Sequence, residues 1–319
     1  MIGWIDGQAG ASGDMLLGAL VGAGVPLEVM QHAVDQLDLG IALRKSEVTR
    51  AGIGAIKVDV QAPDEATSRP WSVIRELVDG TALQVFTRLA EAEAKAHRVP
   101  VDDVHFHEVG GHDAIADIVG VTAGFAHLGL TALSCSTLAL GSGATRGAHG
   151  PIPVPGPAVL ELLSGLPVEA GAAPHEATTP TGAALLATLV TDWSPLAPMR
   201  ISATGHGAGG RDRPELANVL RLVVGEPIDG QSTAVLLETN VDDLDPRLWP
   251  HVLSQLMAAG ASDAWLTPIL MKKGRPAHTL SVLCPAGVAG QLRQVVFRET
   301  STIGLRETTV GKHVLDRTE

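Results

Sequence analysis

The sequence predicts a mixed α/β (α+β) protein of two domains, and three observations support this fold class. Strand-like and helical hydrophobic periodicities alternate through residues 1–228. A stretch of turn-forming residues, E-P-I-D-G-Q-S-T at 226–233, then interrupts them and is the expected linker. Beyond it, the order strand, helix, strand, strand, helix, strand predicts a ferredoxin-like domain over residues 229–319.

Composition narrows the class of protein. The 319 residues are 45% hydrophobic, which excludes a disordered chain, and the net charge of −12 argues against nucleic acid as a partner. The sequence has no apolar run long enough to predict a membrane span. Cys135 and Cys284 are isolated, so neither a disulfide framework nor a thiolate metal site is expected. We expect a cytoplasmic protein without membrane contact.

The first element is a short strand at residues 1–6, followed by the glycine loop G-Q-A-G-A-S-G-D and a helix that ends near residue 23. Backbone amides at such a helix start favour a phosphate, although the loop is neither G-x-G-x-x-G nor a Walker A motif. Asp6 and Asp14 would repel a bare phosphate, so a bridging cation would be needed. Tight packing of a turn explains the glycines equally well. The candidate residues of this loop are Gly10, Ser12, Gly13 and Asp14.

The next stretch is mainly helical. Apolar spacing predicts helices at residues 27–37, 72–78 and 82–98, with a strand near residues 53–60 and a polar loop at 62–69. Leu83, Phe86, Leu89 and Ala90 mark the expected buried face of the helix at 82–98.

The segment 104–120, V-H-F-H-E-V-G-G-H-D-A-I-A-D-I-V-G, concentrates imidazoles and carboxylates. Its first residues alternate as a strand, and helical spacing begins at Asp113. A strand end and a helix start could bring nitrogen and oxygen ligands to one cation such as Zn, Ni, Fe or Mn. The alternative is structural, because Asp113 is also well placed as a helix N-cap. The candidate metal ligands are His105, His107, Glu108, His112, Asp113 and Asp117.

Glycine-rich loops follow at residues 141–151, 178–182 and 205–212, and the second of them opens a helix at 183–190. Glycine allows a ligand to approach the backbone closely, while arginine, threonine and helix-start amides bind phosphate or carboxylate groups. Loops also accumulate glycine without any ligand. Together they predict a pocket for an anionic small molecule. The candidate phosphate-binding residues are Arg146, His149, Thr178, Thr179, Thr181 and Arg211.

In the C-terminal domain we expect strands at 234–241, 264–271, 278–284 and 302–310, with helices at 246–259 and 286–297. The first two strands should run parallel, so the clusters that follow them should meet at one end of the sheet. Acids there could bind Mg or Mn, and the bases could bind a polyphosphate. A structural salt bridge or a solvated turn is the alternative. The two clusters are Asp242, Asp243 and Asp245, and Lys272, Lys273 and Arg275.

The chain resembles the nickel-insertion proteins of nickel-pincer cofactor synthesis. The resemblance runs from residue 4 to beyond residue 306. It is carried by D-G-Q-A-G-A-S-G-D-M-L-L-G-A-L, V-H-F-H-E-V-G-G-H-D-A-I-A-D-I-V-G, T-T-P-T-G-A-A-L-L, E-T-N-V-D-D-L-D-P, W-L-T-P-I-L-M-K-K-G-R-P and T-S-T-I-G-L-R.

The resemblance implies a nickel chelatase of the lyase class that inserts Ni(II) into pyridinium-3,5-bisthiocarboxylic acid mononucleotide. The reaction would depend on CTP with Mn or Mg, and the product would be the cofactor of lactate racemase, itself an expected partner. We also expect a homo-oligomer. Other functional classes stay open: a nickel metallochaperone without turnover, and a metal-dependent nucleotide hydrolase.

Two departures from the family pattern stand out. Residues 62–70 lack the His-rich tract expected before the following helix, which argues against nickel storage. Members also continue past the position of Glu319, which predicts a shortened C-terminal domain in this sequence.

Overall fold

The computed structural model describes residues 1–62, 68–107, 109–147, 150–212, 217–228 and 232–312. The chain divides into two compact units, Met1–Pro227 (unit 1) and Ile228–Glu319 (unit 2). Both units contain helices packed on sheets, which confirms the mixed α/β class. None of the helices in the described part is long and apolar enough to cross a membrane.

Unit 1 is built on a seven-stranded sheet with the order β11-β6-β1-β13-β12-β3-β2. The sheet is mixed, because β1 runs parallel to β6 and antiparallel to β13. Only β1 and β3 were predicted, and β2, β6, β11, β12 and β13 have no counterpart among the predicted strands. In β2 most residues are exposed, so the alternation that signals a strand is weak. The strands are β1 (Ile2–Asp6), β2 (Ala42–Arg50), β3 (Ile53–Gln61), β6 (Ala132–Cys135), β11 (Asp192–Trp193), β12 (Met199–Ala208) and β13 (Val219–Pro227).

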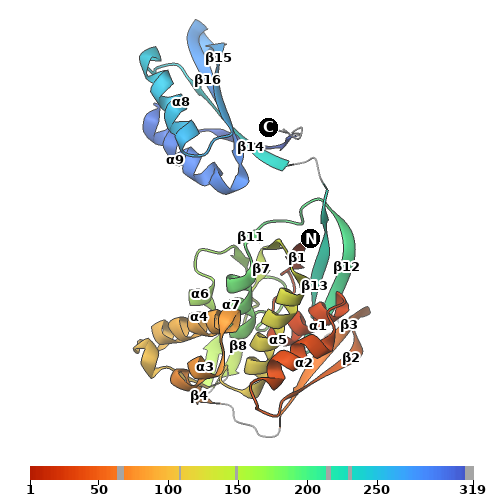
Figure 1. Ribbon diagram of the computed structural model, residues 1–319. Coiled ribbons are helices and arrows are strands. Elements are labelled where there is room, and N and C mark those ends of the chain that lie inside the picture. Colours follow the sequence, from red (N-terminus) through yellow and green to blue (C-terminus); the bar gives the residue numbers. More distant parts are fainter. Residues whose placement is uncertain (63–67, 108, 148–149, 213–216, 229–231, 313–319) are drawn as a thin grey trace. The chain divides into compact units, whose positions relative to one another are not determined.

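Except for α6, which was not predicted, the helices of unit 1 agree with the predicted ones to within a few residues, and their buried faces form one large core. In Figure 1, α1 and α5 lie among the helices beside the sheet, and α1 contacts β3 and β12. The helices are α1 (Gly13–Gly22), α2 (Leu27–Asp35), α3 (Trp71–Leu77), α4 (Gly80–His97), α5 (His112–Leu128), α6 (Pro157–Leu162) and α7 (Pro180–Leu189).

Helix α1 packs against β12 with no side chain between the two backbones. A Cβ atom on Gly207 would lie 1.7 Å from the Met15 carbonyl oxygen, and one on Gly205 would lie 1.8 Å from that of Ala19. This contact corrects the prediction of a loop at 205–212. Strand β12 continues to Ala208, and its glycines serve helix packing rather than a turn.

Helices α1 and α5 run side by side in the same direction. Gly13 of α1 contacts Asp117 of α5. One turn further along, Leu17 of α1 contacts Gly120, and after another turn Leu20 contacts Gly124. Because the two helices start at the same end, their positive dipole ends lie close together.

Short strand pairs complete unit 1. The predicted strand at residue 104 is only β5 (His105–Phe106), which pairs with β4 (Arg69–Pro70). The predicted loop at 141–151 contains an antiparallel pair, β8 (Ala144–Gly147) and β9 (Gly150–Pro153). The remaining pair is β7 (Leu138–Ala139) with β10 (Val168–Glu169).

Unit 2 is a four-stranded antiparallel sheet with the order β15-β16-β14-β17. Its first and third strands are therefore central, and its second and fourth strands form the edges. The predicted strand at 302–310 begins later than expected, because residues 302–305 form a loop. The elements are β14 (Ser232–Val241), α8 (Trp249–Ala258), β15 (Asp263–Met271), β16 (Arg275–Pro285), α9 (Ala289–Glu299) and β17 (Arg306–Lys312).

The contact between α1 and β12 predicts that Gly207→Ala strongly destabilises unit 1. Its new methyl group would meet a helix carbonyl, which cannot move without displacing α1 from the sheet. We expect a loss of about 3 kcal/mol or more in the free energy of unfolding, above the usual cost of overpacking. Denaturant unfolding measures it.

Gly210→Ala is the matched control, since a Cβ at Gly210 meets nothing within 4 Å. We expect this change to leave stability within about 0.5 kcal/mol of the parent. Equal effects of the two substitutions would contradict the packing described.

Candidate functional site

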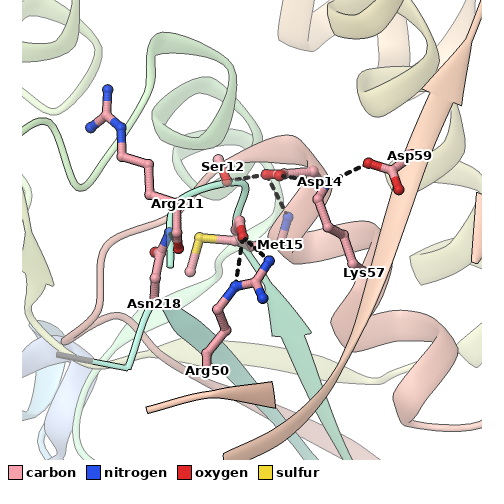
Figure 2. A network of polar contacts seen from close by, with 9 residues as sticks. Ser12, Asp14, Met15, Arg50, Lys57, Asp59, Arg211 and Asn218 are labelled. Carbon is pink, nitrogen blue, oxygen red and sulfur yellow. Dashed lines mark hydrogen bonds and ion pairs between the residues drawn. The ribbon is translucent and has the colours of Figure 1, made fainter. Parts of the chain in front are cut away.

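A cleft of about 220 Å³ in unit 1 collects residues from distant parts of the chain. The start of α1 forms one wall, the residues before α7 another, and the segment after β12 a third. Figure 2 shows Ser12 and Asp14 near Arg211 and Asn218. We call this the unit 1 cleft; it is lined by Ser12, Asp14, Met15, Glu176, Ala177, Thr179, Gly209, Gly210, Arg211 and Asn218.

The glycine loop is held directly on the first turn of α7. A Cβ on Gly182 would lie 2.2 Å from the Ala11 carbonyl oxygen, so only glycine fits there. Ala11 donates its N–H to Thr178 Oγ1 at 3.2 Å, and Thr179 caps α7 by accepting from the Gly182 N–H at 3.2 Å. The start of α1 and the start of α7 are thereby fixed to each other.

The third wall is fixed through its backbone. Arg50 donates from Nε and Nη2 to the Gly209 carbonyl, both at 3.3 Å, and Asn218 Nδ2 donates to the Arg211 carbonyl at 3.1 Å. Arg211 Nη1 donates to the Glu176 carbonyl at 3.3 Å, while its side chain stays exposed. The guanidinium therefore lies at the cleft on a well-anchored segment.

Asp14 connects the cleft to a polar cluster behind it. Its Oδ1 accepts a short hydrogen bond from Ser12 Oγ and another from the Met15 N–H at 2.9 Å. Its Oδ2 lies 3.9 Å from Lys57 Nζ, which lies 2.6 Å from Asp59 Oδ1 (Figure 2). Asp14 thus lines the cleft and also lies near the ammonium group of Lys57 in β3.

Asp117 projects from α5 toward the start of α1. Its Oδ1 is buried and has no hydrogen-bond partner among the described residues. A Cβ on Gly13 would lie 2.2 Å from Asp117 Oδ2, so the missing side chain makes room for this carboxylate. Burial raises the pKa of Asp117 well above its ordinary value, and the charges of Asp14 and Asp113 raise it further, whereas Lys57 lowers it.

The other predicted metal ligands have different surroundings. The rings of His105 and His107 lie 5.9 Å apart between centroids, and His105 Nδ1 is 2.8 Å from Ser68 Oγ. His112 Nε2 accepts from Arg69 Nη2 at 2.7 Å, since a guanidinium can only donate. Glu108 lies outside the described residues, and Asp113 is exposed. Within the described ranges, no three His, Cys, Asp or Glu side chains form a ready metal-binding group.

The predicted phosphate-binding residues also separate into groups. Thr179 and Arg211 line the unit 1 cleft. Thr178 is buried and donates to the Ala139 carbonyl at 2.6 Å, and Thr181 is buried in α7. The Arg146 side chain and the whole of His149 lie outside the part that the structure describes. Lys57 and Asn218 were not among the predicted site residues; no motif marks either, and only the fold brings them here.

Unit 2 has a cleft of its own, of about 540 Å³, beyond the end of β14. Asp243 accepts a short hydrogen bond from Ser301 Oγ, and Arg306 Nη2 donates to Asn240 Oδ1 at 3.1 Å. We call it the unit 2 cleft; it is lined by Glu238, Thr239, Asn240, Val241, Asp242, Asp243, Met271, Ser301, Thr302, Ile303, Gly304, Leu305 and Arg306. The sequence prediction omits Ser301 and Arg306, although the run T-S-T-I-G-L-R, with hydroxyls and a glycine before an arginine, could have indicated a loop.

The other charged residues at this end of the sheet are placed as follows. Arg275 Nη1 lies 3.0 Å from Asp242 Oδ2, which is the salt bridge considered as the structural alternative. Asp245 pairs instead with Arg247 at 2.6 Å, and this hydrogen bonding lowers the pKa of Asp245. Lys272 and Lys273 lie in the turn Lys272–Gly274 and do not line the cleft.

Comparison with known proteins identifies the family. A family model described as nickel insertion protein matches residues 3–319. The chain belongs to the nickel insertion protein family. The resemblance found in the sequence motifs is confirmed.

Members of this family with closely related sequences carry a more specific name. A pyridinium-3,5-bisthiocarboxylic acid mononucleotide nickel insertion protein of Nocardioides sp. is 57% identical over 324 residues, covering 98% of this chain and 82% of its own. A protein of the same name from Desulfitobacterium hafniense is 39% identical over 330 residues, covering 98% and 82%. The apo C-terminal domain of a cyclometallase involved in the synthesis of the NPN cofactor of lactate racemase is 37% identical, covers 27% of this chain and 60% of its own, and has a TM-score of 0.27.

The raised pKa of Asp117 predicts a pH-dependent effect of Asp117→Asn. The folded parent binds a proton at Asp117 more tightly than the unfolded chain does, so this group stabilises the fold below the ordinary value of 3.8. That stabilisation is lost as the pH rises through the raised pKa. Asparagine does not titrate, so the melting temperature of the variant should gain on that of the parent as the pH rises above about 4.

Thermal melts of both proteins across this range provide the measurement. Asp102→Asn is the control, because the side chain of Asp102 is 82% exposed. A difference between Asp117→Asn and parent that stays constant with pH would contradict the burial of this carboxylate.

Proposed function

We propose that this chain is a nickel chelatase that inserts Ni(II) into pyridinium-3,5-bisthiocarboxylic acid mononucleotide. Its family and the names of relatives such as the 57% identical protein support the reaction and the substrate. The observation that carries the proposal is the unit 1 cleft, which joins a helix start, a capped second helix start and an arginine. A phosphorylated heterocycle with acidic substituents needs such donors.

The substrate phosphate would bind between the start of α7 and Arg211. Thr179 fixes the first turn of α7, where the helix dipole favours an anion. The exposed guanidinium of Arg211 can form a bidentate pair with a phosphate monoester. Arg146 and His149 stay proposed contacts from the loop at 141–151.

Nickel itself is a substrate of this reaction. The imidazoles of His105 and His107 are exposed, and their separation suits capture of Ni(II) from solution, with Asp113 as a further proposed ligand.

We infer further that unit 2 is a ferredoxin-like domain that binds CTP with Mn or Mg. Its strand order, with the first and third strands central, and its two helices support the fold. In the unit 2 cleft, Asp242 and Asp243 would hold the metal, while Arg306 and Arg275 would meet the phosphates. The finished cofactor would serve a lactate racemase, as the resemblance implies.

Arg211→Ala tests the substrate site. Protein, Ni(II), CTP with Mn and the dithio-mononucleotide are combined, and the nickel complex is followed by mass spectrometry. Loss of a charged hydrogen-bonding group should lower kcat/KM by about 10- to 100-fold. Arg211→Lys should recover only part of this, because an ammonium group cannot form the bidentate pair.

Arg44→Ala is the control, an exposed arginine of β2 away from the cleft residues. Parent-like activity of Arg211→Ala would sink the proposed phosphate site. Nickel binding by the parent without product would favour a metallochaperone, and CTP turnover indifferent to nickel would favour a nucleotide hydrolase.

Asp243→Asn tests the nucleotide site. If Asp243 holds the metal of a metal–CTP complex, the variant should melt like the parent without nucleotide but lose the shift produced by CTP with Mn. In the parent, a ligand at 100 times its Kd raises the free energy of unfolding by about 2.7 kcal/mol. Asp263→Asn, which changes an exposed carboxylate at the start of β15, should keep the full shift. A full shift in Asp243→Asn would refute this assignment.

A further inference from the structure

The parallel starts of α1 and α5 gather more negative than positive charge. Asp14 belongs to the first turn of α1, and Asp113 and Asp117 belong to the first two turns of α5. The charges of Asp14 and Asp113 both act on Asp117, and among the described residues Lys57 is the cation that acts on it. The adjacent helix dipoles offset part of the excess, since helix N-termini favour anions.

Asp117 is the least satisfied member of this group. Its Oδ1 is buried and accepts no hydrogen bond within the described ranges, although a buried carboxylate without a partner costs free energy. Gly13 leaves the space into which the other oxygen projects. A carboxylate held in such a place is suited to a cation that neutralises it.

We propose that Asp14 and Asp117 hold the nickel ion immediately before its insertion, at a site built from oxygen ligands beside the unit 1 cleft. This inference rests on the proposed function and names the position from which nickel is delivered. The donors are Asp117 Oδ1, Asp14 Oδ2 and Ser12 Oγ, and water completes the coordination. Asp14 and Ser12 also line the cleft, so an ion held here adjoins the bound substrate.

Lys57 lies at the edge of this site. Its Nζ lies 3.9 Å from Asp14 Oδ2 but only 2.6 Å from Asp59 Oδ1, and the Asp59 side chain is 52% exposed. An arriving divalent ion can therefore displace the ammonium group fully onto Asp59, without leaving a buried charge unpaired. Nickel and Lys57 thus compete for Asp14.

The ligand set favours release rather than storage. Carboxylate and hydroxyl oxygens suit hard ions such as Mg and Mn, whereas sulfur ligands suit softer metal ions. Transfer to the thiocarboxylate groups of the substrate is a ligand exchange: nickel–oxygen bonds break and nickel–sulfur bonds form. Nickel stays in the +2 state throughout, and Lys57 returns to Asp14.

Titration of the full chain with Ni(II) alone tests this site. We would use the His105→Ala/His107→Ala background, so that capture by the exposed imidazoles does not mask it. Asp117→Asn or Asp14→Asn in that background should weaken nickel binding at least tenfold or remove one bound ion. Lys57→Met should tighten binding severalfold, because it removes the competing ammonium group; a merely structural Lys57 would not do this.

Asp102→Asn, an exposed carboxylate of the same unit, should bind nickel like the background protein. The melting temperature of each variant without metal establishes that it is folded. If Asp117→Asn is not folded, the nickel affinity of Asp14→Asn decides the test. Unchanged nickel affinity in both Asp variants overturns the inference, as does a Lys57→Met protein that binds no tighter.

The outcome is separable from that of the proposed function. If the variants lose nickel but the parent forms no nickel complex with the dithio-mononucleotide, the site stands and the proposed reaction fails. If the parent forms the complex and Asp117→Asn forms it at the parent's rate, the reaction stands and the site fails.

Discussion

The direct backbone contact between α1 and β12 determines where the candidate functional residues of unit 1 lie. Gly205 and Gly207 leave no room for a side chain under α1, so the helix lies as close to the sheet as two backbones allow. This closeness brings the residues before α1 next to those after β12. Ser12 and Asp14 then meet Gly209 and Arg211 in one cleft, although about 200 residues separate them in the chain.

The same helix also determines the electrostatics behind the cleft. Because α5 runs parallel to α1 and packs on it through glycines, Asp117 is carried into the space left by Gly13. Burying a carboxylate there lowers the stability of the fold at neutral pH, as the raised pKa of Asp117 indicates. Proteins keep such unfavourable groups mainly where function needs them. The cation proposed beside the unit 1 cleft would give this carboxylate a role.

Local patterns in the sequence predicted most of the helices and the strands of unit 2, but few strands of the large sheet and not which residues meet. Periodicity placed helices such as α4 and α5 well, because their buried faces repeat at helical spacing. It failed at β12, where glycine was interpreted as a loop residue, and at β2, whose residues are mostly exposed. Thr179 and Arg211, which line the unit 1 cleft, were candidates because of their chemistry, whereas Lys57 and Asn218 have no local signal. Asp117 was expected beside imidazoles, yet it lies beside Asp14, because helix packing decides its neighbours.

The start of α1, the start of α7 and the segment after β12 are proposed to form one substrate site. Hydrogen–deuterium exchange of the backbone amides, with and without the dithio-mononucleotide, measures this most directly. We expect slower exchange at residues 10–14, 178–182 and 209–212 together, at the same ligand concentration, with little change on the edge strand β11. Protection of only one of these segments, or protection confined to unit 2, would contradict it.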